Sequence, residues 1–246
     1  MRLEYNKRQF PLMAEMPVHI DKEFALKWLE ECGQPWEDPY TSQPGLSSVN
    51  GEVAEKSYGA VEHLCLTGPD KHNKAKNGGH LRVGDEIGEM TSEGRREFTQ
   101  KSWKTISARD KLRGRAGHLM NEYNWGDPYD FYKGSELQKH LTEAFKAPII
   151  RVRYAKMIPG AVIPPHIDYN TTYAVRFIIP LKGTKGVRNV FWKGSEEFEY
   201  SMEPGKCYFL NIGFKHAVYH EGKEERVYLI GSLGGQQDIE AIRFDK

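Results

Sequence analysis

His166, Ile167 and Asp168 place an imidazole and a carboxylate two residues apart, at the end of a segment whose residues favour a β-strand. Side chains on a strand alternate between its faces, so His166 and Asp168 are expected to project from the same face. A third metal ligand must then come from another strand. His216 begins a strand-like run fifty residues later and is placed to complete the set. The spacing predicts a metal centre made of His166, Asp168 and His216.

Two histidines and one carboxylate leave positions on a metal ion open, which is the pattern of non-haem Fe(II) oxygenases. A bidentate 2-oxo acid and O₂ fit such open positions, and the far carboxylate of the 2-oxo acid then needs a cation. Arg226, ten residues after His216, is predicted to lie on the final strand and to supply that cation. Arg176 is a second inward-facing candidate, whose partner is either a substrate carboxylate or a structural Asp or Glu.

Other histidines compete with this assignment. His19, Ile20 and Asp21 form a second His-x-Asp pattern, but Asp21 precedes a helical segment and is better explained as its cap. His220 shares a face with His216 on a regular strand and is the rival third ligand. The ten-residue offset to Arg226 favours His216. Asn211 is expected to be a turn residue.

The second half of the chain consists of short strand-like runs separated by Gly, Pro and Asn turn signals. The expected strands are 149–158, 161–165, 172–181, 188–192, 196–201, 206–211, 216–220 and 226–233. Eight short antiparallel strands predict an α+β, mainly β chain with a double-stranded β-helix, or jelly roll, as its core.

The first half is richer in polar residues and helix signals. Helices are expected from Asp21 through Glu31 and from Ser135 to Phe145, each with an apolar stripe at helical spacing. The stretch 68–117 has weak periodicity and is interpreted as long loops or a lid. We therefore expect residues 1–148 to form an extension of the same domain, packed around a jelly-roll catalytic core at 149–246.

Composition excludes some classes of protein. Hydrophobic residues make up 39% and charged residues 28%, the apolar runs are too short for a membrane span, and no signal peptide is expected. The net charge of +1 gives no field for nucleic acid. Residues 71–115 carry twelve Lys or Arg against six Asp or Glu, either a solvated face or a contact for an acidic partner. Only three cysteines occur, so a reducing cytoplasm is expected.

The order of these residues resembles a known family. A strand ending in Met157, Ile158, Pro159 and Gly160 is followed by His166–Ile167–Asp168, then by Arg176 in an apolar strand, and then by Asn211, His216 and Arg226. This order resembles the 2-oxoglutarate/Fe(II)-dependent oxygenases, and most of all their aspartyl/asparaginyl β-hydroxylase-like branch. The resemblance covers about residues 149–233.

The resemblance implies a double-stranded β-helix fold with Fe(II) bound by His166, Asp168 and His216. It also implies that Arg226 binds the 5-carboxylate of 2-oxoglutarate and that Arg176 holds a substrate carboxylate. Asp168 favours hydroxylation over halogenation, because halogenases of the superfamily replace this carboxylate. One departure is Ile178, which stands where the animal enzymes carry a second co-substrate-binding histidine.

The sequence therefore predicts a dioxygenase that hydroxylates a C–H bond of a carboxylate-bearing small molecule or peptide, using Fe(II), 2-oxoglutarate and O₂. The first alternative is a cupin-like metal-binding protein or isomerase without oxygenase activity. The second is a non-catalytic β-sandwich whose histidines are incidental. Arg226 distinguishes the first reading from the others, because neither alternative needs a cation there. The substrate and the oligomeric state are left open.

Overall fold

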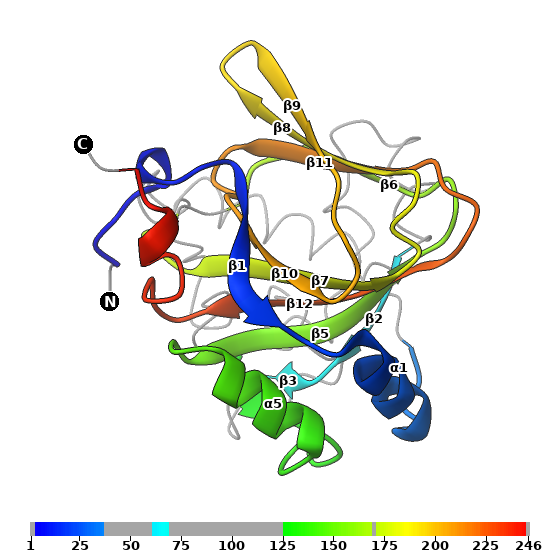
Figure 1. The fold of residues 1–246 in the computed structure, drawn as a ribbon. Helices are drawn as coiled ribbons and strands as arrows, with labels where there is room; N and C mark the ends of the chain where they lie inside the picture. Colours follow the sequence, from blue (N-terminus) through cyan, green and yellow to red (C-terminus); the bar gives the residue numbers. More distant parts are fainter. Residues whose placement is uncertain (1–2, 37–60, 69–124, 169–170, 245–246) are drawn as a thin grey trace, which may run out of the picture.

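The computed structural model of the 246-residue chain describes residues 3–36, 61–68, 125–168 and 171–244 (Figure 1). The basic stretch 71–115 and most of the expected lid at 68–117 lie outside these residues. Within the described part of the chain, no helix is long and apolar enough to cross a membrane. No disulfide joins the three cysteines, and the expected reducing compartment stays a prediction.

The core is the predicted jelly roll, because the eight strands of the second half are divided between two facing sheets, four in each (Figure 1). The larger sheet has the order β1-β10-β7-β12-β5-β2 and the smaller sheet the order β6-β11-β8-β9. Pairs within both sheets are antiparallel. The core strands are β5 (Ile149–Met157), β6 (Val162–His166), β7 (Val175–Lys182), β8 (Val187–Lys193), β9 (Glu196–Tyr200), β10 (Lys206–Leu210), β11 (Lys215–His220) and β12 (Arg226–Leu233).

The turn signals of the sequence coincide with the ends of these strands. Gly194, at the β8–β9 turn, has a φ of 67°, a conformation that other residues rarely adopt. Gly183, after β7, has a φ of 66°, and a Cβ atom there would lie 2.2 Å from the carbonyl oxygen of Glu225. Only glycine fits this close approach, which holds the end of β7 against the start of β12.

Two strands of the first half extend the larger sheet and were not predicted. β1 (Met13–His19) pairs with β10 at one edge, and β2 (Val61–Cys65) pairs with β5 at the other. The alternation of buried Met16, Val18 and Ile20 was a visible strand signal, but Pro17 obscured it, and Pro is tolerated there because β1 is an edge strand. β2 has buried residues on both faces and therefore no alternation to detect. β3 (Thr67–Gly68) and β4 (Asp127–Pro128) form a separate small pair.

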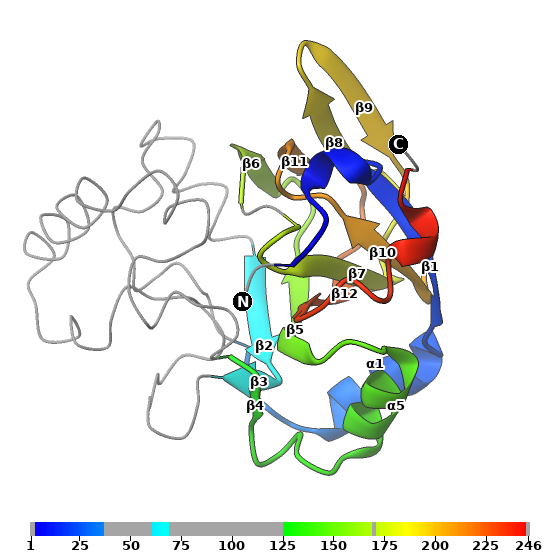
Figure 2. The same cartoon turned by 90° about the vertical axis from the view of Figure 1, so that its left-hand side faces the viewer.

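Both predicted helices are present, and they cover the outer face of the larger sheet (Figures 1 and 2). α1 (Lys22–Glu31) begins at Asp21, whose carboxylate accepts hydrogen bonds from the backbone N–H groups of Glu23 and Phe24. The His19–Ile20–Asp21 pattern is thus explained by a helix cap. α5 (Glu136–Ala144) is capped by Ser135. Short 3₁₀ helices η1 (Lys7–Gln9) and η5 (Glu240–Ile242) lie near the two ends.

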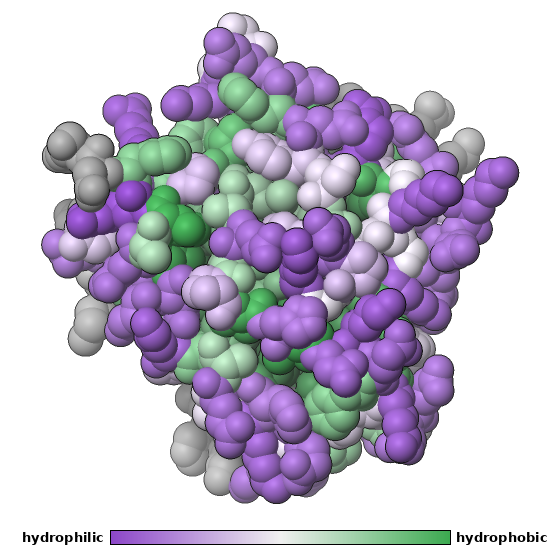
Figure 3. All heavy atoms as spheres, in the orientation of Figure 1, coloured by the Kyte–Doolittle hydropathy of each residue, from purple (hydrophilic) through white to green (hydrophobic). Residues whose placement is uncertain are grey.

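The buried apolar residues form two groups, one on each face of the larger sheet. The outer core, between this sheet and the helices, includes Tyr154, Phe177, Phe209, Leu229, Leu137 and Leu141. The interior core, between the two sheets, includes Met157, Ile178, Phe191, Met202, Tyr208 and Tyr228. On the face drawn in Figure 3, hydrophilic side chains surround smaller hydrophobic areas, as in ordinary globular proteins. Polar side chains buried in the interior core are therefore the candidates for a functional role.

Asn211, which follows β10, forms hydrogen bonds that hold the N-terminal segment in place. Its backbone N–H donates to the carbonyl oxygen of Leu12, and its fully buried side-chain amide lies 2.8 Å, 3.4 Å and 3.0 Å from the carbonyl oxygens of Lys7, Phe10 and Pro11. The turn that follows carries the Ile212 carbonyl, which accepts a hydrogen bond from the backbone N–H of Asp168. Asn211 therefore positions a segment that in turn holds Asp168.

We predict that Asn211→Ala lowers the free energy of unfolding by about 1–3 kcal/mol, because it leaves buried carbonyl groups without a donor. Asn211→Asp should cost at least as much, since a carboxylate would face the same carbonyl oxygens. Urea unfolding measures both changes. Gln34→Ala, which alters an exposed amide, should stay within about 0.5 kcal/mol of the unmodified chain. An Asn211→Asp variant of unchanged stability would contradict this role.

Candidate metal centre

Two neighbouring strands of the smaller sheet bring the predicted histidines together. β6 and β11 pair antiparallel with His166 opposite His216. Their ring centroids lie 4.2 Å apart, and the ring of His216 is stacked on Phe191 of β8 at 5.6 Å. Cross-strand pairing fixes both backbones, and packing against Phe191 fixes the orientation of the His216 ring.

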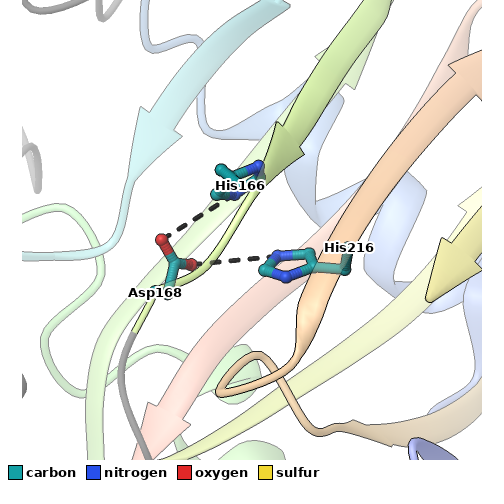
Figure 4. A group of neighbouring side chains, drawn as sticks. All are labelled: His166, Asp168 and His216. Atoms are coloured by element: carbon teal, nitrogen blue, oxygen red, sulfur yellow. Dashed lines mark ion pairs between the residues drawn. The ribbon is translucent and has the colours of Figure 1, made fainter. Parts of the chain in front are cut away.

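Asp168 follows the end of β6 and turns its carboxylate between the two rings (Figure 4). Its Oδ1 lies 3.7 Å from Nε2 of His166, and its Oδ2 lies 4.0 Å from Nε2 of His216. One ligand atom from each of the three residues falls within 4.8 Å of the others. Adjacent ligands on one ion lie about 3 Å apart, given metal–ligand distances near 2.1 Å, so a bound ion would draw the three side chains slightly inward.

The backbone selects the tautomer of both histidines that suits a metal ligand. Nδ1 of His166 lies 2.7 Å from the carbonyl oxygen of Pro164, and Nδ1 of His216 lies 3.0 Å from that of Phe214. A carbonyl oxygen only accepts hydrogen bonds, so each Nδ1 carries the proton and donates it. In a neutral ring, Nε2 then holds the lone pair. Both lone pairs point toward Asp168, as outer partners of metal-bound histidines arrange them.

The local charges favour the metal-binding forms of these groups. Burial, together with the electrostatic effect of His166, lowers the pKa of His216 to about 4 against the opposing effect of Asp168. His216 is therefore neutral at physiological pH.

Loss of solvent around Asp168 raises the pKa of its carboxyl group, but electrostatic interactions with its neighbours outweigh this effect and leave the pKa below its ordinary value. The neighbours that lower it are His166, His216, Arg176 and Arg151. The side chain of Asp168 is 39% exposed, so it remains accessible as a charged ligand.

His220, the rival third ligand, is engaged elsewhere. Its Nε2 lies 2.8 Å from the carbonyl oxygen of Glu224, and its Nδ1 accepts a hydrogen bond from the backbone N–H of Gly222 at 3.3 Å. Both ring nitrogens are thus used by the turn before β12. Among the described residues, the group with metal-ligand spacing contains His216 and not His220.

Arg226 is the most deeply buried charged side chain among the described residues, with 1% of its surface exposed. Its Nη atoms lie 3.8 Å and 3.9 Å from the sulfur atoms of Met157 and Met202, and its guanidinium lies 4.4 Å from the ring centroid of Tyr228. Its Nε has no hydrogen-bond partner within the part of the chain that the structure describes. Burial lowers its pKa, opposed by the contact with Tyr228. Buried charges normally require an oppositely charged partner, and no buried Asp or Glu is present among the described residues.

Arg176 also faces the interior. It lies on β7 between Ala174 and Ile178 of the interior core, and 4% of its surface is exposed. Its charge lowers the pKa of both Asp168 and His216. Arg176 therefore lies within electrostatic range of Asp168 and His216, and its role in binding a substrate carboxylate stays a prediction.

Two arginines on β5 reach the same region and were not singled out from the sequence. Arg153 is 7% exposed and alternates with Ala155 and Met157 of the interior core, a period-two pattern that could have identified it. Arg151 acts on Asp168 electrostatically. Its position depends on a local irregularity of β5 that no sequence pattern indicated.

A comparison with protein families supports the resemblance noted from the sequence. Residues 132–233 match the family described as aspartyl/asparaginyl beta-hydroxylase. This segment contains all five predicted site residues, namely His166, Asp168, Arg176, His216 and Arg226. The predicted resemblance is confirmed over this region. No curated protein sequence matches the chain.

Solved structures similar to the chain include three with related β-folds. An oxidoreductase of the 2OG-Fe(II) oxygenase family from Burkholderia pseudomallei is 19% identical, with 42% of this chain and 56% of that chain covered and a TM-score of 0.32. A Pseudomonas putida prolyl-4-hydroxylase is 17% identical, with 41% and 60% covered and a TM-score of 0.30. A cupin domain from Bordetella pertussis is 14% identical, with 35% and 80% covered and a TM-score of 0.27. The match thus spans little more than half of either oxygenase. Similarities at this level do not show the activity of this chain.

We predict that His216→Ala lowers the affinity for Fe(II) by at least about 100-fold, because even the loss of an outer partner of a metal ligand costs about 10–100-fold. Anaerobic titration with Fe(II), followed calorimetrically, measures the change. The control His140→Ala removes an exposed histidine of α5 and should leave the affinity unchanged. His220→Ala should lower stability while the metal still binds. Unchanged Fe(II) affinity in His216→Ala would exclude this centre.

Proposed function

We propose that the chain is an Fe(II)- and 2-oxoglutarate-dependent dioxygenase that hydroxylates a C–H bond of a carboxylate-bearing substrate, either an amino acid or an amino-acid side chain in a peptide. The observation that carries the proposal is the combination of the His166, Asp168 and His216 cluster with the buried Arg226 in one interior. The family match over residues 132–233 supports it independently.

The cluster fits Fe(II) by the chemistry of its donor atoms. Two imidazole nitrogens and one carboxylate are a ligand set that this ion accepts, with its remaining positions open to other molecules. The carbonyl groups of Pro164 and Phe214 hold the rings in the required tautomer before any metal arrives. His166 and His216 would bind the ion through Nε2, and Asp168 through one carboxylate oxygen.

Arg226 fits the far carboxylate of 2-oxoglutarate. Its planar guanidinium offers paired N–H donors and lies beside two sulfur atoms and an aromatic ring. A carboxylate at this position would be a stronger hydrogen-bond acceptor than these sulfur atoms and would supply a negative charge. The 2-oxo acid group at the other end of the molecule would bind the metal.

Bound iron and 2-oxoglutarate would supply the oxidising chemistry with O₂. The side chains of the protein would bind and orient the reactants and limit the access of water. Arg226 orients the co-substrate by its distal carboxylate. Asp168, His166 and His216 would hold the metal. Apolar side chains of the interior core, including Phe191, Ile178 and Tyr228, limit the access of water. Arg176, close to the candidate metal ligands, would bind a carboxylate of the substrate and so direct one C–H bond toward the metal.

The cupin-like alternative, a metal-binding protein or isomerase without oxygenase activity, accounts for the three candidate ligands equally well. It does not account for Arg226, which has no buried acid as a partner among the described residues. A non-catalytic β-sandwich accounts for neither feature.

The test of the proposal is an anaerobic titration of the Fe(II)-loaded protein with 2-oxoglutarate, followed by the visible band that forms when the 2-oxo acid chelates the metal. We predict that Arg226→Met weakens 2-oxoglutarate binding by about 2–5 kcal/mol, roughly 30-fold or more, while Fe(II) affinity persists. Arg188→Gln is the control, because Arg188 pairs with Glu199 and Glu221 on the surface. Fe(II) binding without the band in the unmodified protein would favour the cupin-like alternative, and equal 2-oxoglutarate affinity in Arg226→Met would remove Arg226 from the site.

A further inference from the structure

Two methionine sulfur atoms lie beside the terminal nitrogens of Arg226. The sulfur of Met157 is 3.8 Å from Nη1 and the sulfur of Met202 is 3.9 Å from Nη2, so each terminal nitrogen has one sulfur next to it. A thioether sulfur is a weak hydrogen-bond acceptor and carries no charge. Either methionine would therefore interact much more strongly with the guanidinium if its sulfur carried an oxygen atom.

The two methionines differ in how easily a small solute can reach them. Met157 is fully buried at the end of β5, where it pairs with β12 on one side and with β2 on the other. Met202 is 6% exposed and belongs to the segment between β9 and β10, where both of its chain neighbours are exposed. Connecting segments open to solvent more readily than strands that are paired on both sides. Met202 is therefore the sulfur that a small oxidant in solution would reach first.

We propose that Met202 is an oxidative modification site whose sulfoxide blocks the binding of the co-substrate to Arg226. The oxidant is a peroxide such as H₂O₂. A lone pair of the sulfur attacks one peroxide oxygen, and the O–O bond breaks as the S–O bond forms. The second oxygen leaves as water after a proton transfer. Sulfur loses two electrons, the peroxide gains them, and the apolar side chain becomes the polar side chain of methionine sulfoxide.

The oxygen of the sulfoxide would stand between the sulfur of Met202 and Nη2 of Arg226, within hydrogen-bonding distance of that nitrogen. Hydrogen bonds to a charged donor are stronger than those between neutral groups. The sulfoxide would thus occupy a donor that the distal carboxylate of 2-oxoglutarate requires. The candidate metal ligands on β6 and β11, and Asp168 after β6, would remain as they are. This inference rests on the proposed function and adds to it a means of regulation.

Mass spectrometry of peptides tests the modification itself. The full chain is treated with H₂O₂ before any metal is added, so that iron does not drive the oxidation. The sulfoxide content of Met13, Met157 and Met202 is then followed with time after digestion. We expect Met202 to be oxidised about tenfold or more faster than Met157. Met13, which is partly buried on the edge strand β1, is the reference for a methionine that does not contact Arg226.

The binding of 2-oxoglutarate to the oxidised protein tests the consequence. The peroxide is removed by gel filtration, Fe(II) is added anaerobically, and 2-oxoglutarate is titrated with the visible band as the signal. We expect the affinity for 2-oxoglutarate to fall by about tenfold or more after oxidation, because the sulfoxide competes for the guanidinium. The affinity for Fe(II), measured by calorimetry, should stay the same.

Variants assign the effect to one sulfur. Met202→Leu removes the oxidisable atom at nearly constant volume, so its affinity for 2-oxoglutarate should be the same before and after peroxide treatment. Met157→Leu is the matched change on the other side of the guanidinium, and this variant should still lose affinity on treatment. Met202→Gln places a carbonyl oxygen near Nη2 without any oxidant, and it should bind 2-oxoglutarate about tenfold more weakly than Met202→Leu.

Three results would overturn the proposal: Met202 is oxidised no faster than Met157, its oxidation leaves the affinity for 2-oxoglutarate unchanged, or Met202→Leu loses affinity on peroxide treatment as the unmodified chain does. Failure of the proposed function is a separate result, because it appears as the absence of the visible band in protein that has not been treated. The peptide measurement would still decide in that case whether Met202 is the preferred site of oxidation.

Discussion

The burial of the Arg226 guanidinium, with no buried carboxylate among the described residues, is the constraint on which the rest of the candidate site depends. Taking an ion out of water costs several kcal/mol even after relaxation. Contacts with two sulfur atoms and an aromatic ring offset only part of this cost. A carboxylate bound at Arg226 would offset more of it, so the same burial that weakens folding would favour binding of an acidic molecule.

Each of the two sheets supplies a different part of the candidate site. The smaller sheet pairs His166 with His216 across neighbouring strands and orients both rings through backbone carbonyl groups. The larger sheet carries the arginines on β5, β7 and β12, which are adjacent strands in the order β7-β12-β5. The candidate metal ligands and these arginines therefore lie on the two sheets that enclose one interior core. The strands fix their relative positions more firmly than loops would.

The sequence predicts the strands and site residues that follow a local residue pattern. It does not predict those that depend on an irregular backbone. The eight core strands were predictable because alternating apolar residues and glycine turns mark their ends, as at Gly194. His166, Asp168 and His216 were found because one strand face holds two of them and a strand start holds the third. The larger sheet was underestimated because Pro17 interrupts the pattern of β1. The position of Arg151 was missed because a bulge has no compositional signature and depends on a local backbone conformation.

The most direct test of the account is an anaerobic crystal structure of the chain with Fe(II) and 2-oxoglutarate bound. The account predicts the metal ion on Nε2 of His166, Nε2 of His216 and the carboxylate of Asp168, with the distal carboxylate of 2-oxoglutarate on Arg226. A metal ion bound by other residues, or a co-substrate whose distal carboxylate lies on Arg153 in place of Arg226, would contradict it.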